Sequence, residues 1–233
     1  MGKPILQNDT LSRIDKNRFS EHELKIKNKL WKILTRSFLQ KFVNDDDVVV
    51  DLGGWDCEFI NNVKCGEKIV VDLNADTQLH ADEGVKLIES AADRIDEISD
   101  KSIDVVFVSN LFEHMKTKEE FENVVIEINR ILVNNGKLLI IQPNIRFAYK
   151  EYWDFFDHYI PISDRTLIEL LEITGFIIKT IHPKFLPFNT KNRLSKATFL
   201  LKIYLKLPLL WHIFGKQLFI EARKESNKTK VYN

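Results

Sequence analysis

Apolar residues follow two different spacings along the chain, and each change of spacing marks a boundary between predicted elements. Short runs rich in Val and Ile predict buried strands, whereas apolar positions that recur every three or four residues predict helices. Strands and helices alternate between residues 45 and 223 without long hairpins, which favours a parallel sheet with crossover helices on both faces. The predicted strands are 48–51, 68–74, 85–90, 103–110, 137–141, 176–181 and 217–223.

Three amphipathic helices are predicted with their caps. Ser20 and Glu23 form a capping-box pattern before a helix that extends to Asn44. A second helix begins after Thr117 and is expected to end at Asn135-Gly136, and a third occupies 163–174. The first helix either covers one face of the sheet or acts as a lid over a ligand site, and the pattern leaves both roles open.

Residues 47–57 form the stretch around which the other elements are organised. A buried strand runs into Gly53 and Gly54, and the loss of two Cβ atoms lets the backbone of the turn approach a ligand closely. Residues 56–63 are interpreted as a short helix whose free N–H groups would face the same ligand. Packing of a plain strand-turn-helix unit would also explain the glycines, so a second feature is needed.

That second feature is an acid at the end of the next strand. Asp72 follows Asp51 by 21 positions. In doubly wound sheets, an acid about 20 residues beyond the glycine turn binds both hydroxyls of a ribose. The glycine turn and Asp72 together predict a ligand that contains adenosine.

Composition narrows the class of protein. The 233 residues suit one α/β domain, 45–223, preceded by a tail and helix (1–44) and followed by a polar tail, 224–233. Two cysteines, Cys57 and Cys65, supply neither a disulfide framework nor a zinc set. The absence of a continuous apolar stretch at the N-terminus favours a cytoplasmic protein.

Charge is unevenly distributed although the net formal charge is zero. Residues 176–233 hold 12 Lys and Arg against 2 Asp and Glu, so the preceding part is acidic by the same margin. This asymmetry suggests that the C-terminal part meets an anionic surface, although a solvated lysine-rich tail would explain some of it.

The assembled pattern resembles the class I S-adenosylmethionine-dependent methyltransferases, closest to the type 11 group, over residues 45–223. The residues that carry the resemblance are Val-Val-Asp-Leu-Gly at 49–53, Val-Val-Asp-Leu-Asn at 70–74, Ile-Asp-Val-Val-Phe-Val-Ser-Asn at 103–110 and Arg-Ile-Leu-Val-Asn-Asn-Gly at 130–136. Phe112-Glu-His114, 142–144, 152–158 and 215–217 are similar to a bacterial subgroup associated with surface-glycan biosynthesis. The resemblance implies a Rossmann-like, mostly parallel seven-stranded sheet whose last strand is antiparallel.

The resemblance also implies S-adenosylmethionine as the cofactor and assigns residues to it. Asp51, Gly53 and Gly54 would shape the pocket for its methionine part and Asp72 would hold its ribose. The remaining assigned residues are Trp55, Leu73, Asn74, Asp93, Asn110 and Leu111. Two positions depart from the family pattern: Trp55 replaces a glycine in the turn, and Ala91 stands where an acid near the adenine amine is usual, with Asp93 as a substitute.

Methyl transfer to a hydroxyl requires alignment of donor and acceptor and removal of one proton. Candidate residues follow the fourth and fifth strands, because ligands of open α/β sheets bind beyond the carboxyl ends of the strands. His158 with Asp157 is the preferred base, and His114 with Glu113 is the second candidate. Local packing of either histidine is the competing interpretation. No spacing typical of a metal site, nucleophilic triad or P-loop is present.

Residues 182–216 form a long connection between the last two strands, and its second half is apolar and basic. Lys202 and Lys206 share one face of a predicted helix that Pro208 interrupts. The stretch 195–214 is too short and too charged to span a bilayer, but it could lie at a membrane interface. Packing against the sheet or a second copy of the chain is the alternative, and the oligomeric state stays open.

The sequence therefore predicts a methyltransferase that acts on a saccharide or glycan intermediate, located in the cytoplasm or at the inner membrane face. A non-catalytic binding or scaffold protein on the same fold is the alternative, because of Trp55 and Ala91. An NAD-dependent oxidoreductase is less favoured, since the turn lacks the second and third glycines that a pyrophosphate needs. A nucleic-acid substrate is not favoured, because an Asn/Asp-Pro-Pro-Tyr/Phe motif is absent and the N-terminal part is acidic.

Overall fold

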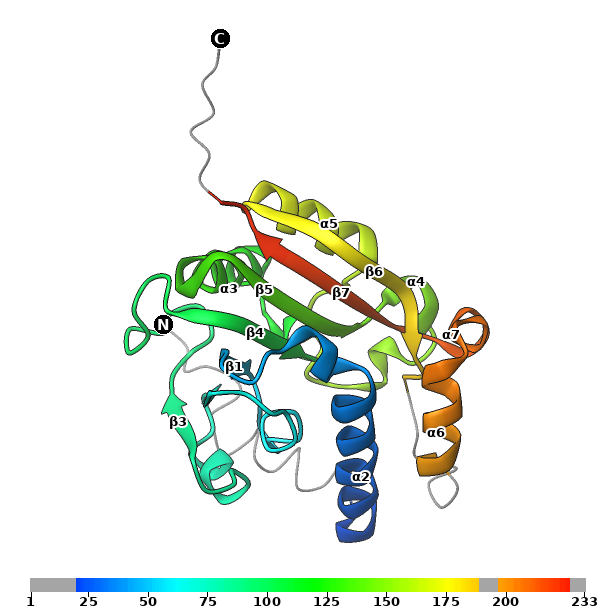
Figure 1. Cartoon of the computed structure of the whole chain (residues 1–233). Helices are drawn as coiled ribbons and strands as arrows, with labels where there is room; N and C mark the ends of the chain where they lie inside the picture. The colour runs from blue at the N-terminus through cyan, green and yellow to red at the C-terminus, as the bar shows by residue number, and fades with distance from the viewer. Residues whose placement is uncertain (1–19, 189–196, 227–233) are drawn as a thin grey trace.

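The computed structural model describes residues 20–188 and 197–226, which form one seven-stranded sheet with helices on both faces (Figure 1). The strands in chain order are β1 Val48–Leu52, β2 Glu67–Asp72, β3 Val85–Glu89, β4 Ile103–Ser109, β5 Leu132–Pro143, β6 Phe176–Leu186 and β7 Gln217–Lys224. Their order across the sheet is β3-β2-β1-β4-β5-β7-β6. Strands β1 to β5 pair in parallel, and β7 pairs antiparallel with both β5 and β6. The predicted Rossmann-like fold, including the antiparallel last strand, is confirmed.

Helices cover the two faces in separate groups. The helices are α2 Glu21–Ser37, α3 Lys118–Ile131, α4 Ile145–Ala148, α5 Asp164–Ile173, α6 Ala197–Lys206 and α7 Pro208–Phe214. In addition, 3-10 helices occupy Leu39–Phe42, Ala75–Leu79, Phe112–His114 and Tyr152–Asp154. Helices α3 and α5 pack on one face, and α2, α6 and α7 pack on the other (Figure 1).

The core divides along the sheet because successive residues of a strand point to opposite faces. In β1, Val50 and Leu52 join the cluster beneath α3 and α5, whereas Val49 joins the cluster beneath α2. All three side chains are fully buried. Burial on both faces explains why the central strands have continuous apolar runs rather than alternating ones.

Helix starts follow the predicted caps. The Ser20 hydroxyl accepts a hydrogen bond from the Glu23 N–H, and the Glu23 carboxylate accepts one from the Ser20 N–H. The Thr117 hydroxyl caps α3 in the same way by accepting from the Glu120 N–H. Ser163 caps α5.

Several predicted elements differ from the structure. Helix α2 ends at Ser37 rather than at Asn44, because a separate 3-10 helix follows it, and β5 begins at Leu132 rather than at residue 137. Residues 56–63 form successive turns instead of a helix, because Cys57 has a φ of 54° and interrupts the helical path. Helix α3 ends at Ile131 rather than at Asn135-Gly136, since Leu132 already pairs with Ile103 of β4. Strand β6 continues to Leu186, because β7 offers it a long antiparallel partner.

Candidate active site

A pocket of about 730 Å³ opens beyond the carboxyl ends of β1, β2 and β4. This size lies within the usual range for small-molecule sites. Its wall includes every residue that the sequence predicted for the cofactor: Asp51, Gly53, Gly54, Trp55, Asp72, Leu73, Asn74, Asp93, Asn110 and Leu111. The fold therefore brings together residues that lie up to 60 positions apart in the sequence.

The turn after β1 requires both glycines, for different reasons. Gly53 has a φ of +72°, a conformation that other residues adopt at a cost. A Cβ at Gly54 would lie 2.7 Å from Cγ2 of Val70 and 2.9 Å from Cγ of Asp51. The turn consequently lies close against β2 and leaves the space beside Asp51 to the pocket.

Asp72 is fixed by the backbone at the end of β2. One carboxylate oxygen accepts the N–H of Trp55 at 3.0 Å, and the other accepts the N–H of Asn74 at 2.9 Å. Each carboxylate oxygen can accept a further hydrogen bond. Asp72 also lines the pocket, so its carboxylate is oriented to receive two neighbouring hydroxyls of a ligand.

Acidic side chains dominate the pocket wall. Among the described lining residues, seven are acidic and two are lysines. One of the lysines, Lys27, already forms ion pairs with Asp56 and Glu58. Such a surface favours a cationic ligand and disfavours the pyrophosphate of a dinucleotide.

The protonation of Asp51 reflects its burial and, to a smaller extent, this surplus of acids. Burial raises the pKa of Asp51 to about 8, and the nearby Glu58 and Asp72 add to the increase although the Ile60 N–H opposes it. Burial likewise raises the pKa of Glu58 to about 7. A ligand with positive charge would therefore relieve an unfavourable electrostatic arrangement in the pocket.

We expect Asp51→Asn to flatten the dependence of stability on pH. Between its ordinary value of 3.8 and about 8, folded Asp51 retains a proton that the unfolded chain releases. Its contribution to stability is therefore fully present below about pH 4 and is lost as the pH rises toward about 8. Melting temperatures between about pH 5 and 9 should fall less in Asp51→Asn than in the wild type. Equal slopes would show that Asp51 does not hold this proton.

Trp55 lines the pocket without filling it. Its indole lies 5.6 Å from the His80 ring, centroid to centroid, at a tilt of 48°. The pocket of about 730 Å³ remains open beside the indole. Ala91 and Asp93 both lie on the wall, so Asp93 is available near the position where the family usually has an acid.

Helix α2 contributes pocket residues that the sequence prediction did not assign to the cofactor. Leu24, Lys27 and Trp31 line the pocket, while Leu34 of the same helix and Phe38 at its C-cap are buried in the core. Trp31 also contacts Phe107 of β4 with ring centroids 6.1 Å apart. The helix thus covers one face of the sheet with one half, as predicted, and lines the pocket with the other. In the sequence, only the amphipathic pattern of this helix could have indicated that some of its residues line the pocket.

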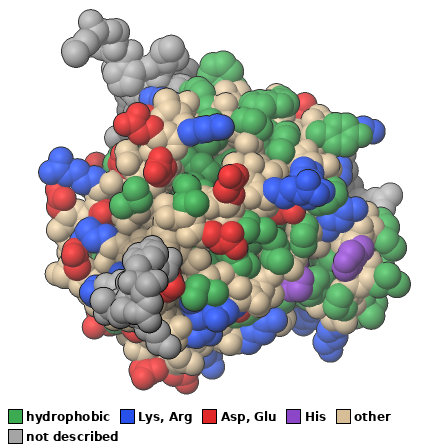
Figure 2. Space-filling model, turned by 90° about the horizontal axis from the view of Figure 1, so that it is seen from above, with side chains coloured by type: hydrophobic (Ala, Val, Ile, Leu, Met, Phe, Trp, Pro, Cys, Tyr) green, Lys and Arg blue, Asp and Glu red, His purple; other side chains and the backbone are tan. Residues whose placement is uncertain are grey.

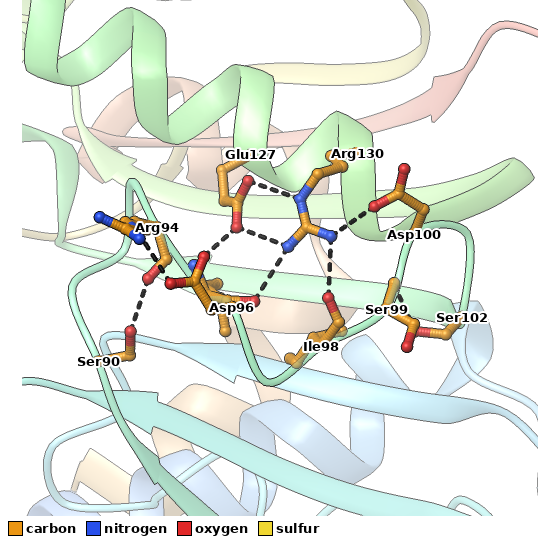
Figure 3. A network of polar contacts seen from close by, with 10 residues as sticks. Ser90, Arg94, Asp96, Ile98, Ser99, Asp100, Ser102, Glu127 and Arg130 are labelled. Atoms are coloured by element: carbon orange, nitrogen blue, oxygen red, sulfur yellow. Dashed lines mark hydrogen bonds and ion pairs between the residues drawn. The ribbon is translucent and has the colours of Figure 1, made fainter.

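Arg130 holds the loop that follows β3, whose first residues line the pocket (Figure 3). Its guanidinium donates to the carbonyl oxygens of Ile95 and Ile98 at 3.0 and 2.9 Å. It also bonds to both oxygens of Glu127 and to Asp100. The loop from residue 90 to 102 is therefore fastened to α3 through Arg130 and through Glu127, whose carboxylate also accepts the Ile95 N–H at 2.6 Å (Figure 3).

We expect Arg130→Ala to lower the free energy of unfolding by about 2 kcal/mol, because several charge-assisted hydrogen bonds are lost. Affinity for a ligand in the pocket should fall as the loop loosens. Arg94→Ala is the matched control, since Arg94 is exposed and its guanidinium pairs only with Asp96 in the described part of the chain. Urea unfolding measures both variants, and an unchanged midpoint in Arg130→Ala would contradict the assignment.

The four predicted catalytic residues form one cluster, but their pairing differs from the expected one. The Nδ1 atom of His114 lies 2.8 Å from the Asp157 carbonyl oxygen and 3.3 Å from its carboxylate. His158 faces Glu113 instead, with Nε2 and Oε1 3.9 Å apart. Asp157 therefore supports His114 rather than His158. His114 and Asp157 line the pocket.

His158 and Glu113 are held behind this wall. The His158 ring stacks on Phe155 at 5.0 Å and contacts Tyr152 edge-on. Burial lowers the pKa of His158, although the Glu113 carboxylate opposes the change. Gln142 of β5 donates a hydrogen bond to the other oxygen of Glu113. The sequence prediction did not include Gln142 or Tyr152 as supports of the site.

Part of the sequence matches a known domain family. Residues 54–140 match the methyltransferase domain family of type 11. No curated protein matches the sequence. The domain match confirms the predictions of a methyltransferase and of S-adenosylmethionine as the expected cofactor.

Solved structures share the fold at low sequence identity. An S-adenosylmethionine-dependent methyltransferase from Thermotoga maritima is 18% identical with a TM-score of 0.65, over 91% of this chain and 99% of that one. One from Archaeoglobus fulgidus is 20% identical with a TM-score of 0.62, over 85% and 94%. A methyltransferase from Haloferax volcanii, solved in complex with its Trm112 activator, is 14% identical with a TM-score of 0.64, over 87% and 93%.

Proposed function

We propose that the protein transfers a methyl group from S-adenosylmethionine to a hydroxyl group of a saccharide or glycan intermediate. The observation that carries the proposal is one pocket with two chemically different walls. One wall holds the buried Asp51 and the carboxylate of Asp72, and the other holds His114 and Asp157. A donor and an acceptor bound to these walls would meet within the same cavity.

The donor wall fits S-adenosylmethionine by charge and by hydrogen bonding. The cofactor supplies a methyl group activated by a positively charged sulfonium, and it carries a second positive charge on its amino group. Asp72 would accept hydrogen bonds from the two ribose hydroxyls. Asp51 would pair with the amino group beside the glycine turn, and Asn110 and Leu111 would lie near the sulfonium, between the donor and acceptor walls.

The acceptor wall fits a hydroxyl. Methylation of a hydroxyl oxygen releases one proton, which a group on the protein must accept or pass to water. His114 and Asp157, which line the pocket, are proposed to hold the acceptor oxygen and to receive that proton, with Glu113 and His158 packed behind them. Their position follows from β4 and β5, whose carboxyl ends both lead toward the pocket.

Exposed aromatic side chains beside the acceptor wall favour a saccharide. Trp153 and Phe156 are 54% and 76% exposed, and Tyr159 lines the pocket. Aromatic faces next to polar groups suit the apolar faces and hydroxyls of a sugar ring. The resemblance of residues 152–158 to methyltransferases associated with surface glycans supports the same substrate class.

Two measurements test this function. Isothermal titration calorimetry should show binding of S-adenosylmethionine and of its demethylated product. Mass spectrometry of glycans incubated with the protein and the cofactor should show the mass gained by one methyl group. Failure to bind the cofactor would favour the alternative of a non-catalytic binding protein.

We propose further that α6 and α7 contact an anionic membrane surface. Tyr204 and Trp211 anchor these helices to the core, with the Trp211 indole N–H donating to the Tyr204 carbonyl at 2.8 Å. The opposite side exposes apolar residues together with Lys202 and Lys206; the apolar ones are Phe199, Leu200, Ile203, Leu207, Leu209, Ile213 and Phe214. Apolar side chains flanked by lysines match an interfacial helix, with the lysines reaching the headgroups.

The distribution of charge supports this orientation. Figure 2 views the molecule from above, and acidic side chains lie mainly in its left and central parts. The right side, where α6 and α7 lie in Figure 1, shows mainly apolar and basic side chains. Among the described residues, no helix is long and apolar enough to cross a membrane.

We expect the protein to sediment with anionic liposomes at low salt and to be released as salt increases. The variant Leu209→Asp/Ile213→Asp should reduce the bound fraction at least about tenfold, because it places charge where apolar contact is required. Replacing the exposed Leu79 with Asp serves as a control on another part of the surface. Equal sedimentation of the wild type and the double variant would contradict membrane contact.

A further inference from the structure

The cluster behind the acceptor wall contains two buried polar side chains, His158 and Glu113, that lie close together without a hydrogen bond between them. The His158 side chain is 4% exposed, and its ring faces the buried carboxylate of Glu113. Its Nε2 lies 3.9 Å from Oε1 of Glu113, whose side chain is 1% exposed. This separation is too long for a hydrogen bond. Burial of an imidazole and a carboxylate without direct contact between them is costly, so a component between them would stabilise the arrangement.

His114 completes a three-residue set around the same gap. One ligand atom from each of Glu113, His114 and His158 lies within 4.8 Å of the other two. Three atoms bound tetrahedrally to one zinc ion at about 2.0–2.2 Å lie roughly 3.3–3.6 Å from one another. Side-chain adjustments of up to about 1 Å would therefore bring all three atoms to one ion.

The outer contacts of the three residues orient them toward this gap. His114 uses Nδ1 for the Asp157 carbonyl and carboxylate, which leaves Nε2 as the ligand atom. Glu113 uses one oxygen to accept from Gln142 and keeps the other for the gap. Phe155 and Tyr152 fix the His158 ring by packing. A histidine held by a carboxylate or carbonyl on its far nitrogen is the usual support of a metal ligand.

We propose that Glu113, His114 and His158 bind one divalent transition-metal ion of the zinc type. Two imidazole nitrogens and one carboxylate oxygen suit zinc, manganese or iron better than magnesium or calcium, which prefer oxygen ligands. Three protein ligands leave a position open on the ion. Because His114 lines the pocket, the open position on the ion would face the acceptor wall.

The role of the ion rests on the proposed function, although its binding does not. An ion at this place would hold the acceptor hydroxyl and make its proton easier to remove. One hydroxyl of a sugar acceptor would occupy the open position. Sequence spacing alone indicated no metal site, because the third ligand comes from a segment 44 residues beyond His114.

Metal titration of the full chain tests this inference. The protein is treated with a chelator and titrated with Zn²⁺ by calorimetry and with Co²⁺ by visible absorption. We expect one ion per chain and a Co²⁺ spectrum of low coordination number. His158→Ala, His114→Ala and Glu113→Gln should each weaken binding at least about tenfold. His212→Ala is the matched control, because His212 is exposed on α7.

S-adenosylmethionine titration of each variant separates loss of the metal ligand from loss of the fold. A variant that binds the cofactor normally but not the metal supports the site. Glu113→Gln keeps the shape of its side chain, and the partly exposed His114 can be replaced with little risk to folding. Absence of metal binding in the wild type, or unchanged affinity in these two variants, would overturn the inference. Metal binding without cofactor binding would instead overturn the proposed function.

Discussion

Asp72→Ala is expected to weaken S-adenosylmethionine binding by at least about 100-fold. The variant removes two hydrogen bonds from a charged acceptor to the ribose hydroxyls, each worth about 1.5–3 kcal/mol, and about 1.4 kcal/mol corresponds to a factor of ten. It also removes the acceptor that holds the Trp55 N–H at 3.0 Å, so the glycine turn loses one of its fixed points. Calorimetric titration with the cofactor measures the effect directly.

Asp93→Ala provides the comparison for this prediction. Asp93 lines the same pocket but is exposed, so its replacement should change affinity by less than about tenfold. Circular dichroism melting of both variants shows whether the fold persists. Asp72→Ala binding as tightly as the wild type would remove the basis for placing the ribose at β2.

Gly54→Ala is expected to abolish measurable cofactor binding and to lower the free energy of unfolding by about 1–3 kcal/mol. The added Cβ would lie 2.7 Å from Val70 and 2.9 Å from Asp51, both of which belong to central strands. Since those strands cannot move apart, the turn itself must shift into the pocket. Denaturant unfolding and calorimetry measure the two effects separately.

Gly84→Ala is the matched control for the glycine turn. Gly84 has a φ of +86°, and a Cβ added there would meet no other atom within 4 Å, so its replacement costs only the backbone strain. It should lower stability modestly and leave cofactor affinity unchanged. If both alanine variants bound the cofactor equally well, close packing of the turn at Gly54 would have no functional role.

Local patterns were sufficient to predict the order of the strands and the helix caps, and the residues predicted for the cofactor line one pocket. Asp51 and Asp72 were identified because strands end where their apolar runs end, and parallel strands end at one edge of the sheet. The helix predicted at 56–63 was wrong, since nothing in its composition reveals the positive φ of Cys57. The fold also places Asp72 where the Trp55 backbone can bond to it, which no spacing rule anticipates.

The sequence predicted which residues form the acceptor wall but not which of them contact one another. Sequence proximity suggested that Asp157 would support His158, its neighbour in the chain. In the fold, Asp157 instead contacts His114, which lies 43 positions earlier. Pairing of this kind depends on how two loops meet in space, and it cannot be deduced from either loop alone.

Helix α2 connects the hydrophobic core to the glycine turn at the pocket. Its C-terminal half is anchored in the core, and Lys27 in its other half pairs with Asp56 and Glu58 beside the glycine turn. A ligand that occupies the pocket gains contacts with α2 only while this segment is docked, so docking and occupancy are thermodynamically linked. Segment 21–31 is therefore a site from which occupancy could be modulated, because anything that pulls it away from the turn must lower affinity by the same coupling energy.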